Sequence, residues 1–434
     1  MRGALRIPFL AGALAAASNV APSCTLVADA DYNQGAASRN VAAADPAACC
    51  ALCAAAGEST CWASVFDPST GCWFKTRNDT ARPGTRAGNT GCWPPGRAPP
   101  PAPSPRPPPP PAYAVDVISL PAVPVISFLA GQSPWPQSFN PSFVEASAGT
   151  RGVRGLLVRS QNCSFTPGTC VRCNPRTPTD VPFLGSVISF APQRADGSFG
   201  APYLVYAPQP GLAEEDKGTE DPRVKYDAAT GLYHMFYTCY GSVGGGLCHS
   251  TTRDPTAPYP GAWTRHGVMW AGKSAALLLR DAPPHYLYQG DSHIALWTTT
   301  DLYNYTKVTP DFIVPRANSF DSALVEAGPP PLRLSTGDYV FFHNSANVSM
   351  NCYHPEYVIL SGADPSVIVQ RAVAPLLSPT RDWELGNAPA ECNVACVVFL
   401  EAAAPVDRLV DTFDVWFGGS DAVIGTARVK VTKL

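Results

Sequence analysis

A run of prolines divides the chain and limits what can fold on either side of it. Trp93–Ala114 reads WPPGRAPPPAPSPRPPPPPAYA. Proline lacks a backbone N–H and fixes φ, so this stretch supports neither a helix nor a sheet ladder. It predicts an extended polyproline II spacer over 94–114. The 434 residues therefore divide into a small module before the spacer and a large domain, 115–434, behind it.

The first residues have the layout of a secretory signal peptide. Arg2 and Arg6 precede an apolar run at 7–17, and small residues follow. We expect residues 1–22 to be a leader that is removed, with a buried helix as the alternative. The run is too short to span a bilayer comfortably. No later stretch is long and apolar enough to do so, and no membrane anchor is expected.

Cysteines and glycosylation sequons also indicate an oxidising compartment. The sequence holds 15 cysteines, which is typical of secreted proteins. N-glycosylation sequons begin at Asn78, Asn162, Asn304 and Asn347. Together with the leader, these features predict a secreted, extracellular glycoprotein with disulfide bonds.

Charge and motifs argue against several classes of function. A net charge of -3 gives no electrostatic footprint for nucleic acid. The CVRC stretch at 170–173 has zinc-like spacing, but a secreted chain favours a disulfide there. The sequence has no HExxH, no GxSxG and no phosphate-binding loop with its lysine. We therefore expect no metal and no cofactor.

The module before the spacer, 23–93, is dense in cysteine. DPAACCALCAAAG predicts a helix with Asp45 as N-cap and Pro46 at the first position. Cys49 and Cys53 lie four residues apart on one helix face, where they could be stapled to strands such as CWASVFDP and GCWFK. Seven cysteines make an odd number, so one is left free or pairs elsewhere.

This arrangement, over about Cys24 to Cys92, resembles a PAN/apple domain. The resemblance implies a small, disulfide-rich α+β domain that binds protein or carbohydrate and is not catalytic. Its expected partner is a cell-wall or matrix glycan or protein.

After the spacer, short runs of β-type residues recur between Gly, Pro, Asp and Asn turns. Examples are GLYHMFYTCY, HIALWTTT, DYVFFHN and DTFDVWFGG. Helix-period patterns are almost absent. Regular short strands over this length predict an all-β sandwich, barrel or propeller. Cys239 and Cys248 flank a glycine-rich hairpin and are expected to pair.

Charged residues gather in the stretch KGTEDPRV, which holds Glu220 and Asp221 side by side. Adjacent residues on a strand point to opposite faces, so these two carboxylates are not expected to act as an acid/base pair. We expect one to face a cavity and the other to bond locally, for instance with Arg223. A structural turn is the alternative.

Other stretches also carry isolated polar groups. Asp321 and Glu326 stand before a triple proline in FDSALVEAGPPP, and Asp421 follows a Gly-Gly turn. SFNPSFVEA and GLLVRSQ carry Asn140 and Arg159. Each of these residues, taken singly, also fits a loop carboxylate or a capping group.

In this order, the stretches resemble glycoside hydrolase family 130, whose members are five-bladed β-propellers that act on β-mannosides. The resemblance covers roughly Pro121 to Val431. Its motifs are Asn140-Pro141 with Arg159, GTEDPR at 218–223, YQGDSHIALWTTTDL at 288–302, the DS…GPPP loop, and the closing strand at 417–427.

The resemblance implies a role for each matched residue. Asp221 would be the general acid, acting through a sugar hydroxyl. Asn140, Arg159 and Asp421 would line the subsite for the non-reducing sugar, where forked hydrogen-bond partners suit vicinal diols. The expected substrate-binding set also includes Arg223, Asp291, Asp321 and His343. Tyr288, Trp297 and Trp416 could stack on sugar faces, with core packing as the alternative.

The same family contains phosphorylases and hydrolases. In the phosphorylases a lysine precedes the GPPP loop and a histidine follows on the next strand. Leu324 holds the lysine's place here, while the histidine remains as His343. Glu326 stands where phosphorylases have a small residue, and an anion there works against a phosphate site. It suits an inverting hydrolase with Asp221 as acid and Glu326 as base, roughly 6.5–9.5 Å apart.

The sequence thus predicts a secreted enzyme that cleaves β-mannosidic or related bonds in oligo- or polysaccharides with inversion. Two alternatives remain at this point. The first is a β-mannoside phosphorylase that forms mannose 1-phosphate with the same Asp221. The second is a non-catalytic propeller that binds glycan.

Overall fold

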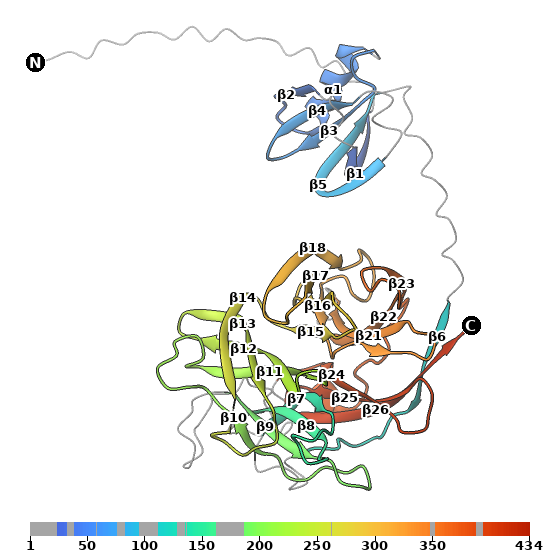
Figure 1. Cartoon of the computed structure of the whole chain (residues 1–434). Helices are drawn as coiled ribbons and strands as arrows, with labels where there is room; N and C mark the ends of the chain where they lie inside the picture. The colour runs from blue at the N-terminus through green and yellow to red at the C-terminus, as the bar shows by residue number, and fades with distance from the viewer. Residues whose placement is uncertain are drawn as a thin grey trace, which may run out of the picture. The chain divides into compact units, whose positions relative to one another are not determined.

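The computed structural model describes residues 24–32, 39–57, 59–75, 83–94, 112–127, 135, 137–161, 186–261, 263–347, 352–387 and 394–434. The chain forms two compact units, Met1–Pro110 and Pro111–Leu434 (Figure 1). The predicted leader, most of the spacer, and Cys163, Cys170, Cys173 and Cys392 lie outside the described residues. None of the described helices is long and apolar enough to cross a bilayer.

In the described residues of the N-terminal unit, one helix, α1 (Pro46–Ala56), packs with a five-stranded antiparallel sheet. Across the sheet the strands are β1 (Thr25–Tyr32), β5 (Pro83–Trp93), β3 (Ala63–Asp67), β4 (Gly71–Lys75) and β2 (Arg39–Val41). The predicted helix start is confirmed: Asp45 caps it by accepting a 2.8 Å hydrogen bond from the N–H of Ala48.

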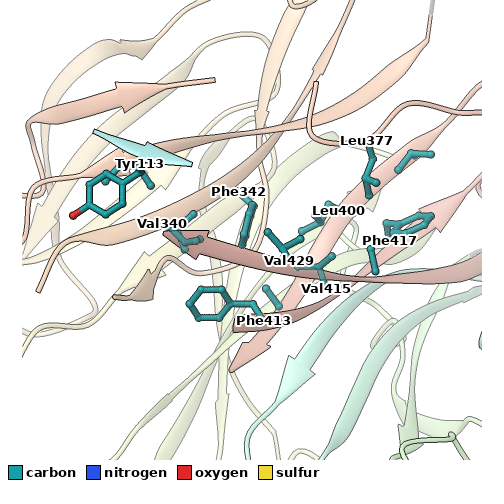
Figure 2. Packing of buried hydrophobic residues seen from close by; sticks show 14 of the residues in the cluster. Tyr113, Val340, Phe342, Leu377, Leu400, Phe413, Val415, Phe417 and Val429 are labelled. Atoms are coloured by element: carbon teal, nitrogen blue, oxygen red, sulfur yellow. The ribbon is translucent and has the colours of Figure 1, made fainter. Parts of the chain in front are cut away.

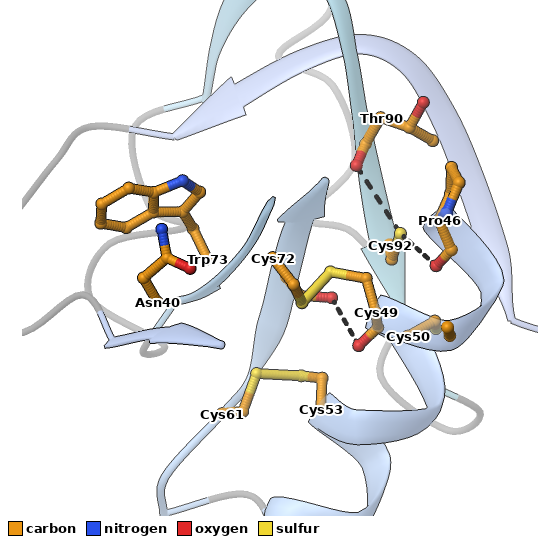
Figure 3. Close-up of a disulfide and its surroundings, with 12 residues drawn as sticks. Asn40, Pro46, Cys49, Cys50, Cys53, Cys61, Cys72, Trp73, Thr90 and Cys92 are labelled. Carbon is orange, nitrogen blue, oxygen red and sulfur yellow. Dashed lines mark hydrogen bonds between the residues drawn. A yellow bond between two sulfur atoms is a disulfide. The ribbon is translucent and has the colours of Figure 1, made fainter. Parts of the chain in front are cut away.

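Three disulfides fasten α1 to its surroundings, as the small core requires. They join Cys24 to Cys50, Cys49 to Cys72 and Cys53 to Cys61; Figure 3 shows the last two. The expected odd cysteine is Cys92, a buried free thiol that points at the carbonyl oxygen of Pro46, 3.2 Å away. Burial raises the pKa of this thiol to about 11.

The described residues of the C-terminal unit form five antiparallel sheets. The first is β7 (Gln137–Val144), β8 (Gly155–Gln161), β9 (Val187–Pro192) and β10 (Tyr203–Tyr206). The second is β11 (Gly218–Asp227), β12 (Leu232–Gly241), β13 (Gly244–Thr252) and β14 (Thr264–Ala271). The third is β15 (Ala275–Leu278), β16 (His285–Gln289), β17 (Ile294–Thr299) and β18 (Tyr305–Ile313).

The fourth sheet is β19 (Leu324–Ala327), β21 (Tyr339–Ala346), β22 (Tyr353–Leu360) and β23 (Ile368–Arg371), with β20 (Leu332–Arg333) beside β21. The short helix α2 (Asp382–Leu385) leads into the fifth sheet: β24 (Val398–Pro405), β25 (Thr412–Gly419), β26 (Val423–Lys433) and β6 (Tyr113–Ser119). The all-β architecture expected from the sequence is confirmed.

Two contacts close the sheets into a ring. The early strand β6 pairs with the last strand, β26, so both ends of this unit share one sheet. β7 contacts both β11 and β24, which brings the first and fifth sheets together. Apart from the early strand β6, each sheet begins along the chain with one strand. We call these strands the leading strands; they are β7, β11, β15, β19 and β24.

Apolar side chains fill the space between successive sheets. In β25, Phe413, Val415 and Phe417 alternate onto one face and pack against Phe342 of β21 (Figure 2). Trp416 points to the other face, into the cluster shared with the first sheet. A strand that is apolar on both faces is expected where sheets cover it from both sides.

Closure of the ring should depend on the buried face of β26. Val429 is fully buried in the cluster of Figure 2, opposite Val117 of β6. We expect Val429→Ala to lower the free energy of unfolding by about 2 kcal/mol, because it leaves a cavity. The matched change Val410→Ala, at a largely exposed site, should stay within about 0.5 kcal/mol. Thermal unfolding of the full chain measures both, and equal midpoints would contradict the prediction.

Candidate active site

The two adjacent carboxylates of β11 are turned toward the same partner. The register between β11 and β12 shifts between Glu220 and Arg223, and Asp221 has φ +50°. This left-handed residue forms a bulge in the strand. Opposite-facing side chains were expected, and that expectation is wrong: the bulge breaks the alternation, so both carboxylates reach Arg159.

Arg159, on β8, joins these carboxylates through a fork of donors. Its Nη2 lies 2.7 Å from Glu220 Oε1, and its Nη1 lies 3.0 Å from Asp221 Oδ1. Its Nε donates to Ser186 Oγ at 2.9 Å, and that hydroxyl lies 3.1 Å from Glu220 Oε1. Glu220 therefore holds the arginine in place for Asp221, a role that the sequence did not reveal.

Asn140 reaches Asp221 from β7 by a similar bulge. It has φ +47°, and the register between β7 and β8 shifts beside it. Its Nδ2 donates to Asp221 Oδ1 at 2.9 Å. A Cβ atom on Gly418 would lie 2.6 Å from Asn140 Oδ1, so a glycine at 418 is required for this approach.

The surrounding cations keep Asp221 ionised. Burial raises the pKa of its carboxyl, as it does for any carboxylate taken out of water. The charges of Arg159, Lys273 and Arg223 outweigh burial, and the pKa of Asp221 falls to about 2.

Arg223, on β11, is fully buried. Its Nη1 donates to the main-chain oxygen of Asp221 at 3.0 Å, and its Nη2 donates to that of Ala327 at 2.8 Å. The same guanidinium forms an ion pair with Glu401 of β24. Burial raises the pKa of Glu401 well above its usual value, although Arg223 opposes the rise. The expected bond between one of the adjacent carboxylates and Arg223 is wrong: both carboxylates bond Arg159, and Arg223 meets Asp221 through its main-chain oxygen. Arg223 instead ties three leading strands together.

Glu326, the proposed base, lies on β19 and is 1% exposed. It accepts a hydrogen bond from Ser274 Oγ at 2.5 Å and forms a 2.9 Å ion pair with Lys273 Nζ. Lys273 itself is 34% exposed. Burial lowers the pKa of this lysine, but Glu326 and Asp221 outweigh burial and raise it. The charges of both proposed catalytic carboxylates thus stabilise the protonated form of Lys273.

Sequence reasoning missed Lys273, because it follows an ordinary Ala-Gly turn before β15. It also missed Tyr353, at the start of β22. Burial, together with the nearby charge of Glu326, raises the pKa of the Tyr353 hydroxyl to about 12; Lys273 opposes this. Asp291, expected at the site, contributes more weakly to the same rise.

Asp421 occupies the turn between β25 and β26. Both Ser420 and Asp421 have positive φ, +47° and +50°. Burial raises the pKa of the Asp421 carboxyl to about 6. Arg159 opposes this rise and the neighbouring charge of Asp221 adds to it. The structure therefore brings Asp421 to the same charged group as Arg159 and Asp221, where the sequence expected it.

These groups all sit on or beside the leading strands and converge on one place. Residues 204–434 match the sequence profile of glycoside hydrolase family 130, described as β-1,4-mannooligosaccharide phosphorylase. A 1,2-β-oligomannan phosphorylase of Thermoanaerobacter sp. (strain X514) is 32% identical over 222 residues, which are 49% of this chain and 69% of that protein.

The chain belongs to glycoside hydrolase family 130.

Solved structures of family 130 have the same fold. The β-1,2-mannobiose phosphorylase from Listeria innocua, in complex with β-1,2-mannobiose, superposes with a TM-score of 0.56 at 18% identity, over 73% of this chain and 96% of that one. A second structure gives a TM-score of 0.54 at 22% identity, over 67% and 84%. It was reported with the finding that this family of mannoside phosphorylases contains glycoside hydrolases that target β-1,2 mannosidic linkages in Candida mannan. The fold is of the propeller type.

Two other predicted substrate residues belong to a second charged network. Asp321 pairs with Arg316 at 2.7 Å and with Arg371. His343 Nε2 lies 3.1 Å from Glu356 Oε1, and Glu356 also pairs with Arg371. Burial opposes ionisation of Glu356, but His343 and Arg371 hold its pKa at about 2. Asp321 and His343 thus belong to one network, because Arg316 and Arg371 each pair with both Asp321 and Glu356.

The aromatic residues suggested for sugar stacking pack against other side chains. Tyr288 is fully buried, and Trp416 is stacked on Phe143. Trp297 stacks on Trp270 with ring centroids 4.2 Å apart. Core packing, the alternative reading, is what the structure gives for all three.

A cavity of about 450 Å³ lies at the other ends of the leading strands. Its lining includes Phe143, Lys225, Leu278 and Pro330. None of the site carboxylates lines it. We assign the chemistry to the charged group around Asp221, because reactive groups converge there and do not converge in this cavity.

The Lys273–Glu326 pair can be tested by a double-mutant cycle. Lys273→Met should lower the free energy of unfolding by roughly 2 kcal/mol, because buried Glu326 loses its cation. The exposure of Lys273 keeps the effect below that of a fully buried pair. Adding Glu326→Gln should restore part of the loss, as chemical denaturation would measure. Simple additivity of the two changes would contradict the pairing.

Asp421 should make stability depend on pH. Its pKa rises from 3.8 to about 6 on folding. The contribution of this carboxyl to the free energy of unfolding is therefore fully present below pH 4 and is lost as the pH rises through 6. Asp421→Asn removes the buried charge and tolerates the left-handed turn. We expect it to raise the denaturation midpoint over the wild type at pH 7 and not at pH 4. The control is Asp407→Asn, at an exposed position. A difference in midpoint between Asp421→Asn and the wild type that does not change with pH would refute the prediction.

Proposed function

We propose that this chain hydrolyses β-mannosidic bonds with inversion at the anomeric carbon. Asp221 is the general acid and Glu326 the general base. The observation that carries the proposal is the pairing of charges in the site. Arg159 is matched by Glu220 and Asp221, and Lys273 by Glu326, while the donors of buried Arg223 are taken by main-chain oxygens and Glu401.

A phosphate co-substrate needs a cation that is not already neutralised. In the described part of the chain, every cation that surrounds Asp221 has a carboxylate partner. His343, the residue that phosphorylases of this family are expected to use, is paired with buried Glu356. This balance favours a neutral co-substrate, and water is the obvious one.

The reaction then follows from the roles of two carboxylates. Glu326 takes a proton from a water molecule whose oxygen attacks the anomeric carbon, while the bond to the leaving oxygen breaks. The leaving oxygen receives a proton that starts on Asp221 and passes through a sugar hydroxyl. Glu326 ends the cycle protonated and Asp221 ionised, and solvent resets both.

Asp221 must first gain a proton, since its pKa is about 2 in the free site. A bound sugar supplies the change, because its hydroxyls compete for the donors of Arg159 and Asn140 that now stabilise the carboxylate. Loss of these donors raises the pKa of Asp221. We infer that Asn140, Arg159 and Asp421 hold the non-reducing mannose and that the linkage is β-1,2, as in the names of the relatives.

Phosphorolysis is the second candidate. The family profile and the 32% identical relative both carry the name of a phosphorylase. Lys273 also keeps a third of its side chain exposed. If Glu326 accepted a proton on substrate binding, Lys273 would be left as a cation for phosphate.

The five sheets are, in this proposal, the five blades of a propeller, and the N-terminal unit is a PAN/apple-like binding module. The three disulfides that fasten the helix to its surroundings, one of them to β4, support that assignment. We propose that the chain is secreted and that the module binds a cell-wall or matrix glycan or protein. Such tethering raises the concentration of the enzyme near polymeric substrate.

The deciding experiment is proton NMR of the full chain with β-1,2-mannobiose, with and without inorganic phosphate. We expect α-mannose to appear first, at a rate that phosphate does not change. Formation of α-mannose 1-phosphate only in the presence of phosphate would establish the phosphorylase instead. No turnover under either condition would favour a glycan-binding protein.

Variants assign the two carboxylates. Asp221→Asn and Glu326→Gln should each lower kcat by roughly 10²–10⁴, the range for general acid–base catalysis. The exposed change Asp407→Asn is the matched control and should leave kcat unchanged. Azide needs no base, so it should restore turnover of Glu326→Gln and not of Asp221→Asn. Full activity of Glu326→Gln would remove it from the mechanism.

A further inference from the structure

A short segment, 394–397, lies between α2 and β24 beside the site. Cys396 in this segment has φ +62°, a left-handed conformation that is costly for a residue with a side chain. Its disulfide to Cys352 joins it to the residue just before β22. Strained residues of this kind persist only where their surroundings hold them.

Backbone hydrogen bonds connect this segment to the site on two sides. The N–H of Tyr353 donates to the carbonyl of Cys396 at 3.0 Å. The N–H of Ser420 donates to the carbonyl of Val397 at 3.2 Å, and the N–H of Val394 donates to that of Ser420 at 3.0 Å. The segment therefore bridges the start of β22 and the turn that carries Asp421.

Both ends of the bridge present groups to the same space. The charges of Glu326, Lys273 and Asp421 all act on the pKa of the Tyr353 hydroxyl. Ser420 and Asp421 both have left-handed backbones, so their turn also relies on outside support. Without the segment, nothing in the described residues gives the amide of Ser420 another partner.

We propose that the Cys352–Cys396 disulfide is a positioning device for sugar binding: it holds Tyr353 and Asp421 at the distance that the non-reducing sugar requires. This inference rests on the proposed function for the identity of the ligand. Reduction of the bond weakens binding of the sugar while the sheets stay folded, because neither cysteine belongs to a sheet core cluster. The bond thus makes affinity depend on an oxidising environment.

The test compares two disulfides of the same unit in the full chain. Cys352→Ser/Cys396→Ser should raise KM for β-1,2-mannobiose roughly tenfold with little change in kcat, because it removes ground-state positioning. Cys239→Ser/Cys248→Ser is the matched control. That bond joins β12 to β13, which are already paired in register, so KM should not change. An unchanged KM in the first variant, or equal rises in both, would overturn the proposal.

Hydrogen exchange of the free protein gives a readout that needs no activity. In Cys352→Ser/Cys396→Ser the amides of Tyr353, Val394 and Ser420 should exchange faster, while that of Val358 within β22 should not. Dithiothreitol on the wild type should reproduce the change, and reoxidation should reverse it. Unchanged protection of these amides in the variant would refute the positioning role of the disulfide. If the wild type shows no turnover, the proposed function is wrong. Hydrogen exchange would still test the role of the disulfide.

Discussion

One buried guanidinium holds the centre of the catalytic unit together. Arg223 leaves β11, bonds the main chain of β19 at Ala327 and pairs with Glu401 on β24. It also bonds the main-chain oxygen of Asp221. Since Glu326 precedes Ala327, the positions of both proposed catalytic carboxylates depend on this one side chain. A buried charge is costly unless it is paired and its hydrogen bonds are made, and Arg223 has both here.

Local strain is the second condition for the site. Asn140, Asp221 and Asp421 all have left-handed backbones although none is a glycine. Asn and Asp tolerate this conformation better than other residues, but it still costs free energy. In return, Asn140 and Asp221 leave the alternation of β7 and β11, Asp421 extends from the turn between β25 and β26, and all three turn toward the shared space. Bulges next to active sites commonly re-aim a side chain in this way, and here two bulged strands and one turn do so at one point.

The sequence could predict what depends on residue type and spacing. The cap at Asp45 and the Cys239–Cys248 disulfide follow from local rules and are confirmed. The pairing of Glu220 and Asp221 with Arg159 could not be predicted from strand alternation, because a bulge is set by tertiary contacts. Lys273 and Glu401 carry no local signal either: each matters only through a partner more than 50 residues away.

The balance of charge links this geometry to the choice of co-substrate. A site for an anionic co-substrate and a site for water can use the same acid, but they need opposite surroundings for the incoming group. Lys273 alone would attract phosphate; beside Glu326 its charge is matched by a carboxylate, which leaves it less able to attract an anion. Ser274 adds a hydrogen bond to the same oxygen. The presence of a carboxylate next to one lysine therefore changes what the whole constellation is suited to activate.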